Sequence, residues 1–176
     1  ISNMNLAKEI SAEILISDIA LKSDFPINSN LPNGVKSHDN GELGIYITYK
    51  TDMPFDKTLH LVPKVLHVGI GCRKGKSYLE INDFFKKIIA ENNINIKSIK
   101  DISSIDIKKD ELGLIEFAEN YKLPINFYSS VELSTLECNF TPSDFVKSVT
   151  GVDNVCERAA FKSSNGGKFI LRKTSD

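Results

Sequence analysis

The feature that most constrains the fold is a glycine-rich segment, Gly69–Ser77, that joins an apolar stretch to an amphipathic one. The stretch Val65–Ile70 is predicted as a short buried strand, because apolar side chains dominate a run of strand length. Apolar residues recur at helical spacing over 81–89, which predicts a helix with one buried face. Ser77 and Glu80 fit the reciprocal capping box that begins such a helix. The sequence therefore predicts a strand, a glycine loop and a helix in direct succession.

A loop at the N-terminus of a helix is suited to anions, because unpaired N–H groups and the positive end of the helix dipole face it. Glycines let backbone amides approach a ligand, and basic side chains add positive charge. Gly71 directly follows the predicted strand, so we expect a backbone conformation or a close ligand approach that a β-carbon would block. We predict a phosphate or carboxylate site with these binding residues: Gly69, Gly71, Cys72, Arg73, Lys74, Gly75, Lys76 and Ser77.

Two other interpretations of this loop are open. A nucleoside-triphosphate loop needs four residues between its first glycine and the Gly-Lys-Ser/Thr triplet. Here three residues separate Gly71 from Gly75 and five separate Gly69 from Gly75, which disfavours that class. A plain strand-to-helix turn with solvated basic side chains is the structural alternative.

The cysteines and histidines predict no metal centre. Cys72, Cys138 and Cys156 are widely and unequally spaced, which favours reduced thiols over a disulfide framework or a zinc site. A helix N-terminus and neighbouring cations would lower the pKa of Cys72 and favour a nucleophile, but a small buried side chain is the stronger alternative. The histidines show no ligand spacing, and His67 alternates with apolar residues as a hydrogen-bonded sheet residue does. We therefore predict no metal and no cofactor.

Charge and hydropathy limit the partners. Lys and Arg number 22 and Asp and Glu number 23, so the net charge of -1 predicts no general attraction to nucleic acid. No apolar run approaches the roughly 20 residues of a membrane span, and the start lacks the pattern of a secretory leader. The sequence predicts a globular, soluble, cytoplasmic protein with no nucleic-acid or membrane partner.

The segment before the glycine loop is predicted as a smaller α/β domain, 1–63, with a boundary at Pro63. Apolar periodicity predicts a helix over about 3–15, and β-type patterns predict strands over 19–22 and 43–49. Asn, Ser, Gly and Pro dominate 28–41, which predicts an exposed loop. A polar connection is expected over 51–57.

The remainder, 64–176, is predicted as a three-layer α/β/α domain with a mostly parallel or mixed sheet, because strands and helices alternate. Strands are expected over 96–105, 125–128 and 168–172. Helices are expected to be capped by Asp110, Thr141 and Asp153.

A second candidate site follows the strand that ends at Ile105. Lys108 and Glu111 lie three residues apart where a helix begins, so they suit either an acid–base pair or a solvated helix start. Ligands bind parallel sheets at the carboxyl ends of the strands. We therefore expect this segment and the glycine loop to line one cleft.

Three blocks, Gly69–Gly75, Ile105–Ile115 and Gly151–Ala160, resemble the signatures of the cobalamin biosynthesis protein G family (CbiG). They occur in the family's order within Leu61–Lys173, and the preceding residues resemble the family's middle region. The resemblance implies a three-layer C-terminal domain with a mixed sheet. Family members also carry a larger N-terminal domain, so the resemblance implies that these residues are a fragment of the enzyme.

The resemblance implies an activity as well. The family acts in the anaerobic branch of cobalamin synthesis, where it opens the δ-lactone of cobalt-precorrin-5A and releases acetaldehyde to give cobalt-precorrin-5B. The implied partners are this cobalt corrinoid, which carries the only metal, and other enzymes of the pathway. Lactone hydrolysis needs oxyanion donors and a base for water, and the candidate catalytic residues are Lys108, Glu111 and Glu157. A non-catalytic tetrapyrrole-binding module and an anion- or nucleotide-binding regulatory domain are the alternatives.

Overall fold

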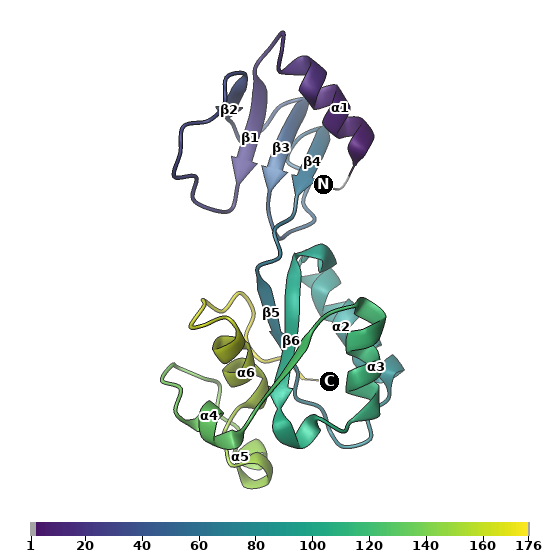
Figure 1. Cartoon of the computed structure of the whole chain (residues 1–176), viewed down its shortest axis with the longest axis vertical. Helices are drawn as coiled ribbons and strands as arrows, with labels where there is room; N and C mark the ends of the chain where they lie inside the picture. The colour runs from purple at the N-terminus through teal and green to yellow at the C-terminus, as the bar shows by residue number, and fades with distance from the viewer. Residues whose placement is uncertain (1–2, 176) are drawn as a thin grey trace. The chain divides into compact units, whose positions relative to one another are not determined.

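A computed structural model describes residues 3–175, which form two compact units (Figure 1). The first contains the residues up to Val65 together with Glu91–Ser98. The second contains Leu66–Ala90 and the residues from Ile99 onward. Each unit has its own sheet, and every strand pair within these two sheets is parallel.

The first unit is a four-stranded sheet in the order β2-β1-β3-β4, with helix α1 packed on it. Ile10 of α1 forms a core cluster with Ile19 and Leu59 from the strands. Asn3 caps the helix with its side-chain oxygen. The elements are α1 (Met4–Glu13), β1 (Ile19–Ser23), β2 (Val35–Ser37), β3 (Leu43–Ile47) and β4 (Lys57–Leu61).

Strands β2 and β4 were not expected from the sequence. Strand β2 lies inside the stretch predicted as a loop and is only three residues long. Strand β4 is rich in polar residues, but Thr58 and His60 are buried because each finds a hydrogen-bond partner in the preceding loop. Hydrophobic alternation therefore does not mark either strand.

The second unit is built on a three-stranded sheet in the order β5-β6-β7. Its strands are β5 (Leu66–Gly69), β6 (Ile99–Ile105) and β7 (Ile125–Tyr128), and its α-helices are α2 (Tyr78–Glu91), α3 (Leu112–Tyr121), α4 (Ser130–Ser134), α5 (Asp144–Thr150) and α6 (Val155–Ser163). Two 3₁₀ turns, η1 (Ile96–Ser98) and η2 (Asp106–Lys108), precede and follow β6.

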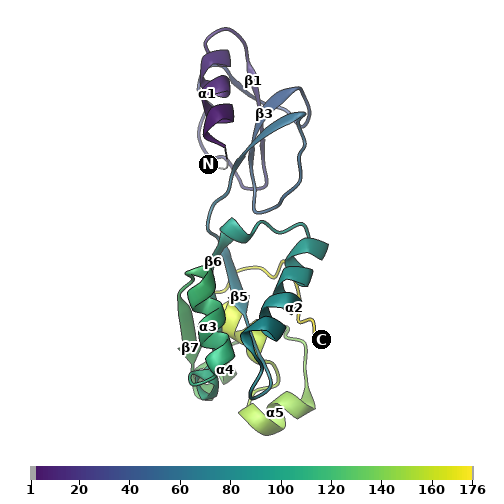
Figure 2. The same ribbon diagram turned by 90° about the vertical axis from the view of Figure 1, so that its right-hand side faces the viewer.

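Helices cover both faces of this sheet. Figures 1 and 2 show α6 on one face and α2 with α3 on the other. Helices α2 and α3 meet through Phe85, Phe117 and Tyr121, whose ring centroids lie 4.9–5.4 Å apart. Edge and tilted contacts of this kind add to the free energy gained by burial. The α/β class predicted from the sequence is confirmed.

Several predicted boundaries are wrong, and two of the side chains expected to cap helices, Thr141 and Asp153, have other partners. Ser143 rather than Thr141 caps α5, and Asn154 rather than Asp153 caps α6. Asp153 instead binds Arg158 Nε at 2.7 Å. The residue at the N-cap of α3 is Glu111, not Asp110. The segment 168–172 is not a strand; it follows an irregular path on which Phe169 stacks against Phe161.

Candidate functional site

The glycine loop leaves the carboxyl end of β5 and is tied to the neighbouring strand. Ile70 N–H donates to the carbonyl of Ser103 at 2.8 Å, and Ser104 Oγ donates to the carbonyl of Ile70 at 2.6 Å. Gly75 then turns the chain with a φ of +78°, in the left-handed region that favours glycine. The loop is thus fixed at both ends.

The start of α2 forms the predicted capping box. Ser77 N–H and Oγ donate to Glu80 Oε2 at 3.0 and 2.8 Å, and Glu80 N–H donates back to Ser77 Oγ at 3.3 Å. The donors of Ser77, with help from Lys76, lower the pKa of Glu80 to about 2. Lys76 lies 3.0 Å from Glu80, so its positive charge is shared with this carboxylate.

Arg73 and Lys74 are exposed, and within residues 3–175 neither side chain has an ion-pair or hydrogen-bond partner. The backbone N–H groups of Gly71, Arg73 and Lys74 likewise donate to no acceptor in that part of the chain. The loop therefore presents cationic side chains and free amides to solvent, which is the donor set that carboxylates and phosphates bind.

Glu111 joins this loop to the second predicted segment. Its Oε2 accepts a hydrogen bond from Gly75 N–H at 2.9 Å, and its Oε1 lies 3.0 Å from Lys108 Nζ. The side chains of Lys108 and Glu111 are each 14% exposed. The Gly75 amide and the Lys108 ammonium hold the pKa of Glu111 below its usual value. The structure thus brings together two segments that are separated by the whole of α2.

Gly113 belongs to the same junction and was missed by the sequence analysis. A β-carbon at Gly113 would lie 2.2 Å from the carbonyl oxygen of Lys76. The first turns of α2 and α3 therefore approach each other closely, so two helix dipoles direct partial positive charge toward the loop. Glycine is unfavourable inside a helix, and its occurrence at the second position of α3 was the available clue.

The other side of the loop packs on the start of α6. A β-carbon at Gly69 would lie 1.7 Å from the carbonyl oxygen of Cys156, so only glycine fits there. At Gly71 a β-carbon would lie 3.7 Å from Val155 Cβ, which is an ordinary contact, and Gly71 is not among the glycines with positive φ. The expected special conformation of Gly71 is therefore wrong, and Gly69 is the position with the packing constraint.

Glu157 belongs to a different set of hydrogen bonds from Lys108 and Glu111. Its buried carboxylate, on a residue only 4% exposed, accepts bonds from Thr141 N–H and Oγ1 and from Lys173 N–H, each at 2.8 Å. Arg172 NH1 lies 3.4 Å away. No hydrogen bond or ion pair within residues 3–175 joins Glu157 to Lys108 or Glu111. Of the three predicted catalytic residues, the structure brings two into contact.

The protonation of Glu157 should be visible in the stability of the protein. Burial raises the pKa of Glu157, but the N–H groups of Lys173 and Thr141 outweigh it and the net pKa is lowered. The ionised form therefore stabilises the fold above the unfolded pKa of about 4.3, and this contribution is lost as the pH falls through the lower folded pKa.

We expect the free energy of unfolding, measured with urea between pH 6 and 3, to fall less steeply in Glu157→Gln than in the wild type. Glu119→Gln, an exposed change on α3, is the control and should keep the wild-type slope. Equal slopes in all three proteins would contradict the assignment.

Neither cysteine near the loop is activated. Burial raises the pKa of the Cys72 thiol despite the opposing charge of Lys108, and burial likewise raises the pKa of Cys156. Both groups are therefore neutral thiols at pH 7. Cys72 thus behaves as the small, partly buried side chain that was the stronger alternative.

His67 is the hydrogen-bonded sheet residue predicted from the sequence. Its Nδ1 lies 2.9 Å from Asp101, and Ser163 Oγ of α6 donates to the same carboxylate at 2.8 Å. Residues 3–175 contain no group of three or more Asp, Glu, His or Cys side chains placed to hold a metal ion. In the same range, every helix is too short or too polar to cross a membrane.

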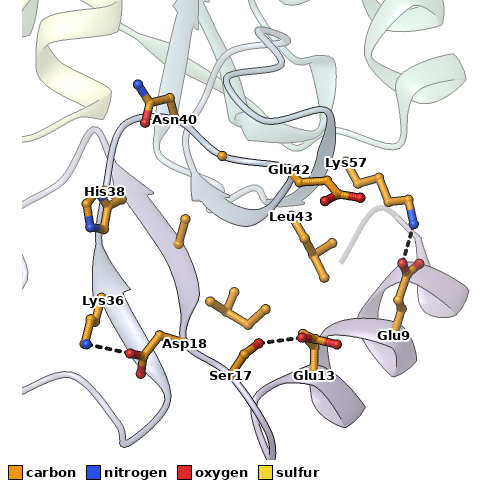
Figure 3. Close-up of a pocket in the computed structure, with 13 residues that line it drawn as sticks. Glu9, Glu13, Ser17, Asp18, Lys36, His38, Asn40, Glu42, Leu43 and Lys57 are labelled. Carbon is orange, nitrogen blue, oxygen red and sulfur yellow. Dashed lines mark hydrogen bonds and ion pairs between the residues drawn. The ribbon is translucent and has the colours of Figure 1, made fainter.

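A separate pocket of about 650 Å³ lies in the first unit, at the amino ends of β1, β3 and β4 (Figure 3). Its wall carries both signs of charge, and two of its cations are paired: Lys36 with Asp18 and Lys57 with Glu9. Glu13 and Glu42 also line the pocket, so its wall is acidic overall. No motif of the sequence predicts a site here.

Residues 66–176 match the family model described as cobalamin synthesis G C-terminus. A cobalt-precorrin-5A hydrolase from Priestia megaterium is 40% identical over 111 residues, which are 63% of this chain and 29% of that protein. The crystal structure of CobE, a protein from the cobalamin biosynthetic pathway, superimposes with a TM-score of 0.59 at 30% identity, covering 65% of this chain and 85% of CobE.

A structure of a cobalamin biosynthesis protein G homologue from Sulfolobus solfataricus covers 98% of this chain and 51% of its own, with a TM-score of 0.51. At 23% identity this match shows a shared fold, and it extends over both units. The chain spans 29–52% of the length of three hydrolase relatives.

Proposed function

The chain belongs to the CbiG family of cobalamin biosynthesis, and on that premise we propose that it takes part in hydrolysing the δ-lactone of cobalt-precorrin-5A. Water adds to the lactone carbonyl, the acyl–oxygen bond breaks, and a carboxylate and an alcohol form. The alcohol then breaks its carbon–carbon bond to the macrocycle. The electron pair of this carbon–carbon bond stays on the macrocycle, and the two-carbon fragment leaves as acetaldehyde. The reaction consumes one water and needs no oxidant.

The observation that carries this proposal is the bridge from Gly75 through Glu111 to Lys108 beside an exposed cationic loop. Glu111 holds the attacking water, and Lys108 stabilises the negative charge that develops on the carbonyl oxygen. The Gly75 amide is occupied by Glu111, so the free amides of Arg73 and Lys74 are the donors available to an oxyanion or to a substrate carboxylate.

A carboxylate-binding module without catalysis is the second candidate. It is favoured by the exposed side chains of Arg73 and Lys74 and the free amides of the loop, which suit carboxylate binding without any chemical step. Acetaldehyde formation from cobalt-precorrin-5A under anaerobic conditions separates the two, if this chain and a full-length family protein containing it are assayed side by side. Release by both supports catalysis within this chain, whereas binding without release supports the module. Displacement of the corrinoid by inorganic phosphate at similar concentration would instead favour an anion-binding regulatory domain.

We expect Arg73→Ala to weaken binding of cobalt-precorrin-5A by about 10-fold to 100-fold, since a charge-assisted bond contributes about 1.5–3 kcal/mol. Isothermal titration calorimetry at two salt concentrations measures the dissociation constant, and added salt should weaken binding by the wild type more than binding by the variant. Lys100→Ala is the control, because Lys100 is an exposed cation near the amino end of β6. An unchanged dissociation constant for Arg73→Ala would remove the loop from the binding site.

A further inference from the structure

Lys173 is a basic residue that differs from the exposed Arg73 and Lys74 of the glycine loop. It is half-buried, and its ammonium has no hydrogen-bond or ion-pair partner within residues 3–175. A cationic side chain with no partner in the protein can pair with an anionic group of a ligand. In contrast, Lys76 and Lys108 each have a glutamate partner. The charge of Lys173 is thus available to a ligand.

The segment that carries Lys173 is irregular but firmly attached. The N–H of Lys173 itself donates to Glu157 Oε1 at 2.8 Å. The preceding residue, Arg172, lies 4.3 Å over the ring of Phe169 and donates to the carbonyl of Asn139 at 2.6 Å. Glu157 is in turn held by both donors of Thr141. The position of the Lys173 backbone is therefore set by the buried carboxylate of Glu157.

Lys173 lies on the α6 side of the loop. Its N–H is bonded to Glu157, which follows Cys156 in the first turn of α6. The backbone of Cys156 contacts the loop, since a β-carbon at Gly69 would lie 1.7 Å from its carbonyl oxygen and one at Gly71 would lie 4.0 Å from its nitrogen. Glu111 contacts the loop at Gly75 and holds Lys108, which places this pair on the α3 side of the loop.

We propose that Lys173 binds a carboxylate of the substrate on the α6 side of the glycine loop, and that Glu157 is the residue that positions it. The inference rests on the proposed function and adds to it a binding residue that the sequence analysis did not select. It also gives Glu157 a different role from the predicted catalytic one, because every donor that reaches its carboxylate belongs to the segments it holds in place. A polycarboxylate is then bound from two sides of the loop, by Arg73 and Lys74 and by Lys173.

The first test is the affinity of this chain for cobalt-precorrin-5A, measured anaerobically. Lys173→Gln should weaken binding about tenfold or more, while Lys173→Arg should stay within about threefold of the wild type, because it keeps the charge. Lys168→Gln, an exposed lysine on the same segment, should have no effect. If the wild-type chain does not bind cobalt-precorrin-5A, the proposed function is refuted. If the wild type binds and Lys173→Gln binds equally tightly, only this inference is overturned.

The second test is a double-mutant cycle on Glu157 and Lys173. If Glu157 acts by positioning Lys173, Glu157→Gln weakens binding in the wild-type background and has little further effect in Lys173→Gln. Equal losses in both backgrounds would show a general structural effect and overturn the positioning role. If Glu157→Gln does not fold, Arg172→Gln is the substitute, because it removes an exposed side chain that binds Glu157 from the same segment. We then expect the same non-additivity between Arg172→Gln and Lys173→Gln.

Discussion

Replacing Glu111 by glutamine should slow acetaldehyde release by about 10²–10⁴-fold in a full-length protein, with little change in affinity for cobalt-precorrin-5A. The amide keeps the shape of the side chain and an oxygen for the Gly75 N–H. It loses the charge that holds Lys108 at 3.0 Å and that we propose orients the attacking water. Single-turnover measurements of acetaldehyde separate the chemical step from binding.

The matched control for this prediction is Glu119→Gln, which removes an exposed carboxylate from the same helix and should leave the rate unchanged. If both Glu111→Gln and Glu157→Gln retain full activity, neither is the catalytic base, and the result favours a chain that binds and positions the substrate. A loss of affinity without a loss of rate would instead make Glu111 a structural support of the loop.

The lowered pKa of Glu111 determines how it contributes. A carboxylate with a pKa below the ordinary value of about 4.3 is a weak proton acceptor at neutral pH, but it is fully ionised there. Glu111 is therefore better suited to hold water and to keep Lys108 in place than to remove a proton completely. We infer that the rate is insensitive to protonation of Glu111 between pH 5 and 7.

The parts of this molecule that were predictable from sequence are those determined by neighbouring residues. The Ser77–Glu80 capping box and the helix that follows it depend on contacts within one turn and one face, and both are confirmed. The carboxyl-edge rule for parallel strands placed the segment containing Glu111 near the glycine loop. Local pattern and one general rule of topology were sufficient for these features.

The remaining features depend on residues distant in the chain. Thr141 and Asp153 look like helix caps, but Glu157 and Arg158 occupy their side chains. The role of Gly113 appears only when the first turn of α2 is packed against it. No sequence spacing indicated that Glu157 and Lys173 would be joined by a hydrogen bond. Tertiary partners therefore decided both the misplaced caps and the missed residues.

Gly69→Ala should lower the free energy of unfolding by about 3 kcal/mol or more, at the upper end of the cost of overpacking. The added methyl would lie 1.7 Å from the carbonyl oxygen of Cys156 and 2.6 Å from its carbonyl carbon. These are backbone atoms of α6, so no flexible side chain can move aside. The helix or the end of β5 must shift.

Gly71→Ala is the matched control two residues away, because its methyl would meet Val155 Cβ at 3.7 Å, an ordinary contact. Its stability should stay within about 0.5 kcal/mol of the wild type. Thermal and urea unfolding of the two variants and the wild type measure the difference. Equal stability of Gly69→Ala and Gly71→Ala would mean that α6 does not pack on the end of β5. In that case Lys173 and Cys156 would lose their place beside the loop, and the two-sided binding of the substrate would fail with them.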